Sequence, residues 1–138
     1  MSPITTPKDK WPAFWKRARQ FHRSMQSIPK EDTGPVVSNA VICGISAIDS
    51  LAVLTLGKHS SNHNDSAMIL NNIRTNDDNK RKKIAEKFME LVSLKYRAQY
   101  DDYLPSKNDA EKALSLAKEI FSFVESELRS MGVEAPQD

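Results

Sequence analysis

Residues 36–57, with the sequence VVSNAVICGISAIDSLAVLTLG, decide the fold of this chain. Nearly all of them are apolar, and on a helical wheel Asn39, Ser46 and Ser50 form one narrow polar stripe. A helix that is apolar almost all round is typical of the centre of a bundle, and Gly57 is a suitable residue to end it. The segment therefore predicts a central, buried helix.

A membrane span is the competing interpretation of so long an apolar segment. Asp49 lies near its middle, and a carboxylate makes insertion into a bilayer costly. We therefore expect no membrane association.

Asp49 is the most informative polar residue, because the wheel places it between Ile42, Ile45 and Val53. A buried carboxylate needs a hydrogen-bonding or positive partner, or it must hold a proton. It then either ties this helix to a neighbour or belongs to a functional pocket. We expect Asp49 to be at least half buried and bonded to His63 or Arg97.

Four further helices are predicted on either side of this segment, from apolar residues at three- and four-residue steps and from capping residues. They are a helix from Pro12 to about Met25, a short helix capped by Asn62 and Asp65, a helix that the basic run Lys80–Lys83 opens and that runs towards Tyr100, and a helix from the Ser106–Asp109 capping box to Gly132. Because the connections are short, we expect an all-α, up-and-down antiparallel bundle of about five helices. Residues 1–138 are predicted to form one domain, with disordered tails over 1–10 and 133–138.

Composition is that of a globular protein, with 39% hydrophobic and 28% charged residues and a net charge of +2. The single cysteine, Cys43, excludes an internal disulfide and favours a reducing compartment. The first residues lack an apolar signal-peptide core, so a cytoplasmic location is expected. Basic residues dominate positions 1–30 and acidic residues dominate 109–138. This asymmetry indicates either an anionic partner or antiparallel helices of opposite charge.

No residue pattern in the chain is typical of a hydrolytic nucleophile or of a glycine-rich phosphate loop. His59, His63 and Asp65 are spaced like metal ligands, but the intervening Ser-Ser-Asn is poor helix, so we expect no metal and no cofactor. The basic run Lys80–Lys83 is interpreted either as a solvated helix face or as a contact for phosphate or nucleic acid.

The segment AVICGISAIDSLAVLTLGK (residues 40–58), the later His63, and YRAQYDDY (residues 96–103) before the capped last helix resemble the HEPN domain family over about residues 36–128. The resemblance implies a helical bundle that often forms a homodimer. Many family members are metal-independent ribonucleases or partners of small nucleotidyltransferases in toxin–antitoxin and antiviral systems. Others bind RNA or nucleotides without catalysis.

Active members of that family carry an arginine followed four to six residues later by a histidine. Arg97 matches the arginine, but residues 98–104 contain no histidine. Arg17 and His22 also have this spacing, yet they lie in the first helix and about 140° apart around its axis, so we interpret that match as chance.

The resemblance therefore predicts a non-catalytic domain that binds RNA or nucleotide phosphates or docks on a partner protein. The alternatives are a metal-independent ribonuclease that uses Arg97 with Tyr103 or His63, and a purely structural or regulatory bundle. The expected partners are a second copy of the chain, RNA or a nucleotide, and a nucleotidyltransferase or another protein. Arg97 is expected to be the main anion contact unless it pairs with Asp101 on its own helix. The expected auxiliary contacts are Tyr100, Lys58, Lys80, Arg81, Lys82 and Lys83.

Overall fold

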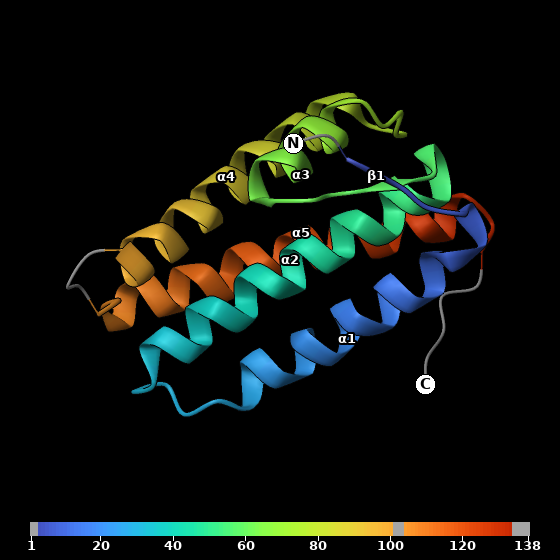
Figure 1. Ribbon diagram of the computed structural model, residues 1–138. Coiled ribbons are helices and arrows are strands. Elements are labelled where there is room, and N and C mark those ends of the chain that lie inside the picture. Colours follow the sequence, from blue (N-terminus) through green and yellow to red (C-terminus); the bar gives the residue numbers. More distant parts are fainter. Residues whose placement is uncertain (1–2, 101–103, 134–138) are drawn as a thin grey trace.

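The computed structural model describes residues 3–100 and 104–133, without the side chains of residues 63, 64 and 97–100. Five α-helices make up most of this part of the chain, as the sequence predicted (Figure 1). The helices are α1 (Trp11–Ser27), α2 (Thr33–Leu56), α3 (His63–Asn71), α4 (Asp78–Tyr100) and α5 (Lys107–Ser130). Two short strands, β1 (Ile4–Thr5) and β2 (Lys58–His59), and a 3-10 turn, η1 (Lys8–Lys10), complete the described elements.

The apolar helix α2 lies at the centre of the bundle and contacts each of the other four helices (Figure 1). Its side chains form the middle of one continuous core, together with fully buried residues such as Trp15, Phe88 and Phe123. The core even covers two members of the polar stripe, Ser46 and Ser50. The hydroxyl of Ser50 donates to the Ala47 carbonyl at 2.7 Å, so the burial of this residue leaves its hydroxyl satisfied.

Helix α2 has the length and mean hydropathy of a membrane span, and it is the one such helix in the described part of the chain. In the bundle, 78% of its most apolar window is buried by the other elements. This packing is that of the core helix of a helical bundle.

Local signals set most helix ends where the sequence predicted them. Asn62 accepts a hydrogen bond from the Asp65 amide and begins α3, and Ser106 and Asp109 form a reciprocal capping box at α5. Gly57 follows α2 with a φ of 67°, a left-handed conformation that glycine adopts without steric cost. The start of α2 at Thr33 is earlier than the predicted Val36, because Pro35 fits within the first helical turn.

Helices α4 and α5 run antiparallel, and polar contacts define their register. Lys87 pairs with Glu119, and Glu90, one turn further along α4, pairs with Lys112, about two turns earlier on α5. At the other end, the Asn76 amide donates to Glu127 at 3.3 Å. Helices α4 and α5 thus match opposite charges across their interface, while a match between residues 1–30 and residues 109–138 stays a prediction.

Residues 3–10 are ordered, although the sequence predicted a disordered tail over residues 1–10; residues 1, 2 and 134–138 lie outside the described part of the structure. Ile4 pairs with His59 and Thr5 pairs with Lys58 in an antiparallel two-stranded ladder, and the Thr6 amide donates to the Gly57 carbonyl at 2.8 Å. Two-residue strands have no alternating pattern, which is why their sequences carry no strand signal. Their pairing brings the N-terminal segment against the loop that follows α2 (Figure 1).

Candidate functional site

Asp49 is buried, as predicted, with 5% of its surface exposed. Its described partner is Ser60, in the loop after β2. The Ser60 amide donates to Asp49 Oδ1 at 2.9 Å, and the Ser60 hydroxyl lies 2.9 Å from Oδ1 and 3.1 Å from Oδ2. The expected bond to a group from another segment is therefore present. The side chains of the two partners that the sequence suggested, His63 and Arg97, lie outside the described part of the structure, so a bond from either to Asp49 stays a prediction.

Burial raises the pKa of Asp49 to about 6, because an ionised carboxylate is poorly solvated in the core. The two hydrogen bonds from Ser60 and the positive charge of Arg17 oppose this rise in pKa. Asp49 is thus mainly ionised at neutral pH, and it is ready to accept hydrogen bonds.

A pocket of about 380 Å³ opens beside Asp49, and we call it the Asp49 pocket. It lies between α1, α2 and the loop after β2, and its walls include an aromatic pair in which the rings of Phe14 and His59 have centroids 5.0 Å apart. The Arg17 guanidinium lies 5.7 Å from the centroid of the Phe14 ring. The lining residues are Phe14, Arg17, Ile45, Asp49, His59, Ser60, Ser61 and Asn62.

His59 is held by the strand pair, since its Nδ1 lies 2.5 Å from the Thr6 hydroxyl. Partial burial, followed by the charge of Arg17, lowers the pKa of His59 below its usual value. Asp65 is buried nearby and accepts hydrogen bonds from the amide and hydroxyl of Ser61, which lower its pKa. Of the three residues that are spaced like metal ligands, His59 and Asp65 therefore already have protein partners.

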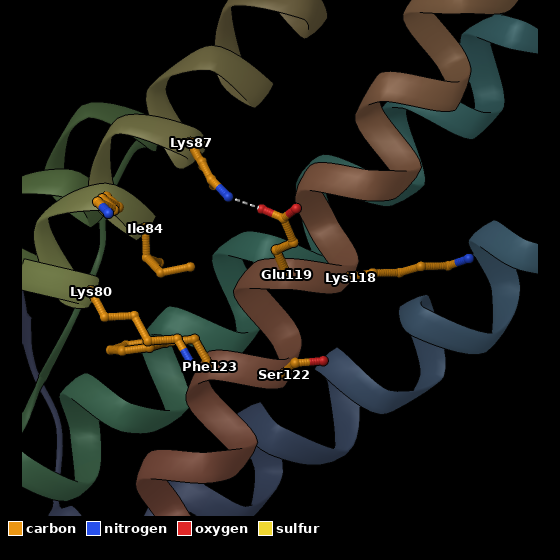
Figure 2. Close-up of a pocket in the computed structure, with 8 residues that line it drawn as sticks. Lys80, Ile84, Lys87, Lys118, Glu119, Ser122 and Phe123 are labelled. Atoms are coloured by element: carbon orange, nitrogen blue, oxygen red, sulfur yellow. Dashed lines mark hydrogen bonds and ion pairs between the residues drawn. The ribbon is translucent and has the colours of Figure 1, made fainter. Parts of the chain in front are cut away.

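A second hollow, of about 440 Å³, lies between α4 and α5, and we call it the α4–α5 groove (Figure 2). Ile84 and Phe123 supply buried, apolar side chains, and Ser122 adds a hydroxyl. Figure 2 shows Lys87 directed towards Glu119, while Lys118 extends from α5 in another direction, towards α1. The lining residues are Lys80, Lys83, Ile84, Lys87, Lys118, Glu119, Ser122 and Phe123.

The basic run at the start of α4 divides between two faces of the helix. Lys80 and Lys83 line the α4–α5 groove, whereas Arg81 and Lys82 line a separate hollow between α3 and α4. The three- and four-residue spacing of Lys80, Lys83 and Lys87 places them on one face of a helix. This spacing could have added Lys87 to the predicted anion contacts. The residues of α5, by contrast, join the groove only through tertiary packing.

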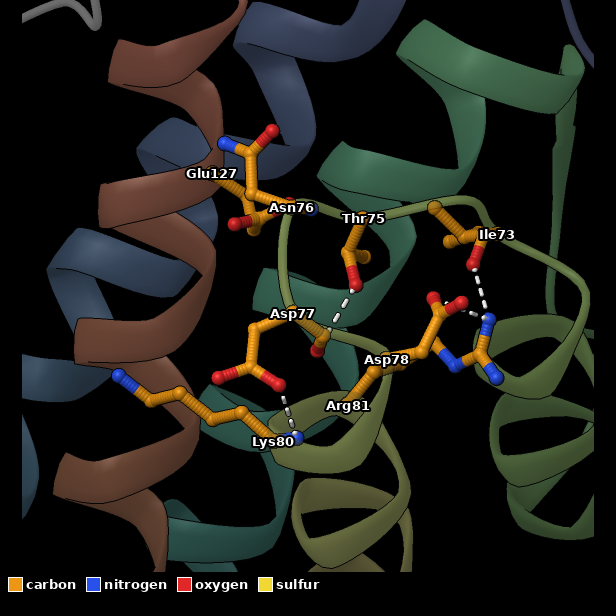
Figure 3. A network of polar contacts seen from close by, with 8 residues as sticks. All are labelled: Ile73, Thr75, Asn76, Asp77, Asp78, Lys80, Arg81 and Glu127. Carbon is orange, nitrogen blue, oxygen red and sulfur yellow. Dashed lines mark hydrogen bonds and ion pairs between the residues drawn. The ribbon is translucent and has the colours of Figure 1, made fainter.

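Arg81 has a structural role that the sequence did not predict. Its guanidinium donates to the Ile73 carbonyl at 2.7 Å and lies 3.2 Å from Asp78 (Figure 3). Only 12% of its side chain is exposed. The same loop is held from α5, where Glu127 accepts the amide of Asn76. Arg81 thus helps to hold the connection between α3 and α4, while its expected contact with an anion stays a prediction.

The remaining predicted residues fall into two groups. Lys58 is exposed in β2, beside Thr5 of the paired strand. The backbones of Arg97 and Tyr100 belong to the last turn of α4, and that of His63 begins α3, but their side chains lie outside the described residues, as does all of Tyr103.

Arg17 and His22, the pair that the sequence analysis interpreted as a chance match, lie at different places along α1. Arg17 lies at the Asp49 pocket. His22 packs on Phe121 of α5, with ring centroids 4.0 Å apart. Each residue therefore has a separate environment.

Comparison with known proteins gives one family. The model of the HEPN domain matches residues 51–127, which is more than half of the chain. The match runs from the last residues of α2 to near the end of α5 and includes both helices of the α4–α5 groove. No curated protein and no solved structure matches the chain.

Proposed function

Because the chain belongs to the HEPN domain family, we propose that it is a non-catalytic domain that binds the phosphates of single-stranded RNA in its α4–α5 groove. The observation that carries the proposal is the excess of positive charge there. Four lysines surround the groove, against one carboxylate, Glu119. Phosphate contacts by lysine supply most of the sequence-independent affinity for nucleic acid.

Two of these lysines lack an ion pair among the described residues, and this supports the proposal further. Lys87 is engaged by Glu119, whereas Lys80 and Lys83 form no ion pair with any carboxylate that the structure describes. Positive charge in the first turns of a helix opposes the helix dipole, so local helix stability does not account for these two lysines. An anionic ligand does account for them.

The length of the lysine-bearing face of α4 is also suitable for binding a strand of RNA. Seven residues of α4 separate Lys80 from Lys87, which is about 10.5 Å along the helix axis and enough to follow more than one phosphate. Arg97 belongs to the last turn of the same helix. Arg97 is 17 residues beyond Lys80, about 25 Å further along the axis and about 100° round it, so a strand would have to cross from the groove face of α4 to reach it.

The test measures the binding of a fluorescently labelled single-stranded RNA of about 20 nucleotides, by anisotropy, over a range of salt concentrations. The double variant Lys80→Gln with Lys83→Gln should bind more weakly. The slope of log K against log salt should become shallower by about 1.4, or about 0.7 for each phosphate that is no longer neutralised. The matched control is Lys10→Gln with Lys16→Gln, because both lysines are exposed and lie outside the groove.

Equal weakening in the two double variants would overturn the groove as the binding site and leave only attraction by net charge. The absence of a catalytic step has its own test, in which the chain is incubated with RNA in EDTA. Cleavage that disappears in Arg97→Ala would contradict the non-catalytic assignment and favour a metal-independent ribonuclease. The absence of a histidine from residues 98–104 supports binding without cleavage.

We also retain as proposals the cytoplasmic homodimer and the nucleotidyltransferase partner that the family resemblance implies. Light scattering would measure the first, with an expected mass of twice 15.6 kDa.

A further inference from the structure

Glu119 is the one carboxylate among the described residues that line the α4–α5 groove. It pairs with Lys87, which lies across the groove on α4 (Figure 2). The pair is open to solvent, since 45% of the Glu119 side chain and 39% of the Lys87 side chain are exposed. A ligand that enters the groove can therefore reach both side chains.

Lys87 follows the two groove lysines that have no ion pair with a described carboxylate. It lies on the same face of α4 as Lys80 and Lys83, about 6 Å beyond Lys83 along the helix axis. The fourth lysine of the groove, Lys118, is directed from α5 towards α1 (Figure 2). In agreement with this direction, burial and then the charge of Lys118 lower the pKa of His22 on α1. Lys87 is thus the next cation for a strand whose phosphates contact Lys80 and Lys83.

The carboxylate of Glu119 and a phosphate of RNA make the same kind of contact with a lysine. Each offers anionic oxygens that accept hydrogen bonds from the ammonium group. The lysine stem is flexible and an exposed ion pair contributes little to stability, so Lys87 can exchange one anion for the other. Contacts between lysine and phosphate gain further free energy from the counterions that the nucleic acid releases. The exchange is therefore favourable, but Glu119 opposes it because the ion pair must first open.

We propose that Glu119 occupies, on Lys87, the position that one phosphate of the bound strand takes, and that it thereby limits the affinity of the groove. Binding opens the ion pair and transfers Lys87 from the carboxylate to the phosphate. Glu119 is a positioning residue, because its effect on the strand passes through Lys87. This inference rests on the proposed RNA-binding function and identifies a residue that sets its affinity.

The anisotropy assay with labelled single-stranded RNA tests this role in Glu119→Gln, which keeps the size of the side chain and removes its charge. The variant should bind about two- to fivefold more tightly, because binding no longer has to break an exposed ion pair. The matched control is Glu90→Gln, which also removes one carboxylate and releases one lysine, Lys112, from an exposed ion pair between α4 and α5. Neither residue of that pair lines the groove. In about 0.15 M salt, where charges more than about 8 Å apart are largely screened, the control should change the affinity much less.

A double-mutant cycle with Lys87→Gln separates the exchange from an effect of net charge. In the unaltered chain, Lys87→Gln removes a phosphate contact and also removes the need to open the ion pair. In the Glu119→Gln background it removes the phosphate contact alone, so the loss of affinity should be about two- to fivefold larger there. In both backgrounds the slope of log K against log salt should become shallower by about 0.7, which corresponds to one phosphate.

The groove variant Lys80→Gln with Lys83→Gln distinguishes failure of this inference from failure of the proposed function. If that variant binds RNA more weakly while Glu119→Gln binds no more tightly than the unaltered chain, the inference is wrong and the groove stands. If that variant binds as the unaltered chain does, the groove is wrong and the inference with it. Equal tightening in Glu119→Gln and Glu90→Gln, or an equal loss from Lys87→Gln in both backgrounds, would overturn the exchange of anions on Lys87.

Discussion

The burial and the hydrogen-bond partners of single polar residues in this protein depend on which segments the fold places around them. Asp49 and Arg81 illustrate this, because each is largely buried and each bonds to a loop. Asp49 accepts from Ser60, in the loop that follows β2, and Arg81 donates to Ile73, in the loop that precedes its own helix. The burial of Asp49 could be predicted from the apolar residues on either side of it on the helical wheel. Its partner Ser60 could not, since a serine in a polar loop carries no signal of where its amide points.

We predict that Asp49 makes stability fall as pH rises through the acid range. Its pKa is raised to about 6 in the folded chain, against about 3.9 when unfolded, so between these values the folded state holds a proton that the unfolded state has lost. The stabilisation is therefore complete below about pH 4 and lost as pH passes 6. Urea unfolding of Asp49→Asn should lack this contribution, on the order of 2–3 kcal/mol between pH 4 and pH 7.

The comparison uses the difference between the variant and the unaltered chain, because His22 and His59 also titrate. Burial lowers the pKa of both histidines, so their effect has the opposite sign and stability falls as pH drops below about 6.5. Both are retained in the variant. A difference that does not change with pH would contradict the raised pKa of Asp49.

Arg81 and Lys82 are neighbours in the same basic run, yet we predict opposite sensitivities to substitution. Arg81→Gln removes the donor to the Ile73 carbonyl and should lower the free energy of unfolding by about 1–2 kcal/mol, as expected for a buried bond from a charged group. Lys82 is exposed, and Lys82→Gln should change it by less than about 0.5 kcal/mol. Chemical denaturation of both variants measures the contrast, and equal effects would contradict a structural role for Arg81.

At the scale of the element, α2 shows how closely the helices pack. A Cβ built on Gly44 would lie 3.3 Å from Leu91 of α4 and 3.7 Å from Ile120 of α5. Gly34, near the start of the same helix, has nothing within 4 Å. The two glycines look alike in the sequence, and only the neighbouring helices distinguish them.

We predict that Gly44→Val destabilises the bundle by about 1–3 kcal/mol, because added methyl groups would force apart a packed core. The matched substitution Gly34→Val should cost less than Gly44→Val, because no residue other than its chain neighbours lies within 4 Å of a Cβ there, and its cost arises from Pro35, which disfavours a helical backbone in a β-branched residue before it. Thermal unfolding followed by circular dichroism tests the pair. A Gly44 variant as stable as the Gly34 variant would show that α4 and α5 do not approach α2 as described.

At the scale of the whole molecule, the N-terminal segment completes the Asp49 pocket. The ladder of β1 with β2, and the contact of Thr6 with His59, hold the loop that carries Ser60. The chain thus uses a segment more than fifty residues away in sequence to position the donor of Asp49.

We predict that deletion of residues 1–7 loosens this loop while leaving the bundle folded. The amide of Ser60, which donates to Asp49, should exchange with deuterium about five- to tenfold faster, corresponding to a decrease of about 1 kcal/mol in local stability. Amides of residues 113–124 in the middle of α5 serve as the internal control. Unchanged exchange at Ser60 would contradict a supporting role for β1.

The sequence by itself determined the helices, because apolar periodicity, the Asn62 and Ser106 caps and Gly57 act over only a few residues. It also determined the central place of α2 and the burial of Asp49, which follow from apolar surface that must be removed from water. The tertiary structure alone decided which residues meet at the two sites: Lys80, Lys83 and Lys87 with Ser122 in one, and Arg17 and His59 with Asp49 in the other. These contacts depend on helix register and on a two-residue strand pair, and neither produces a periodic pattern in the sequence.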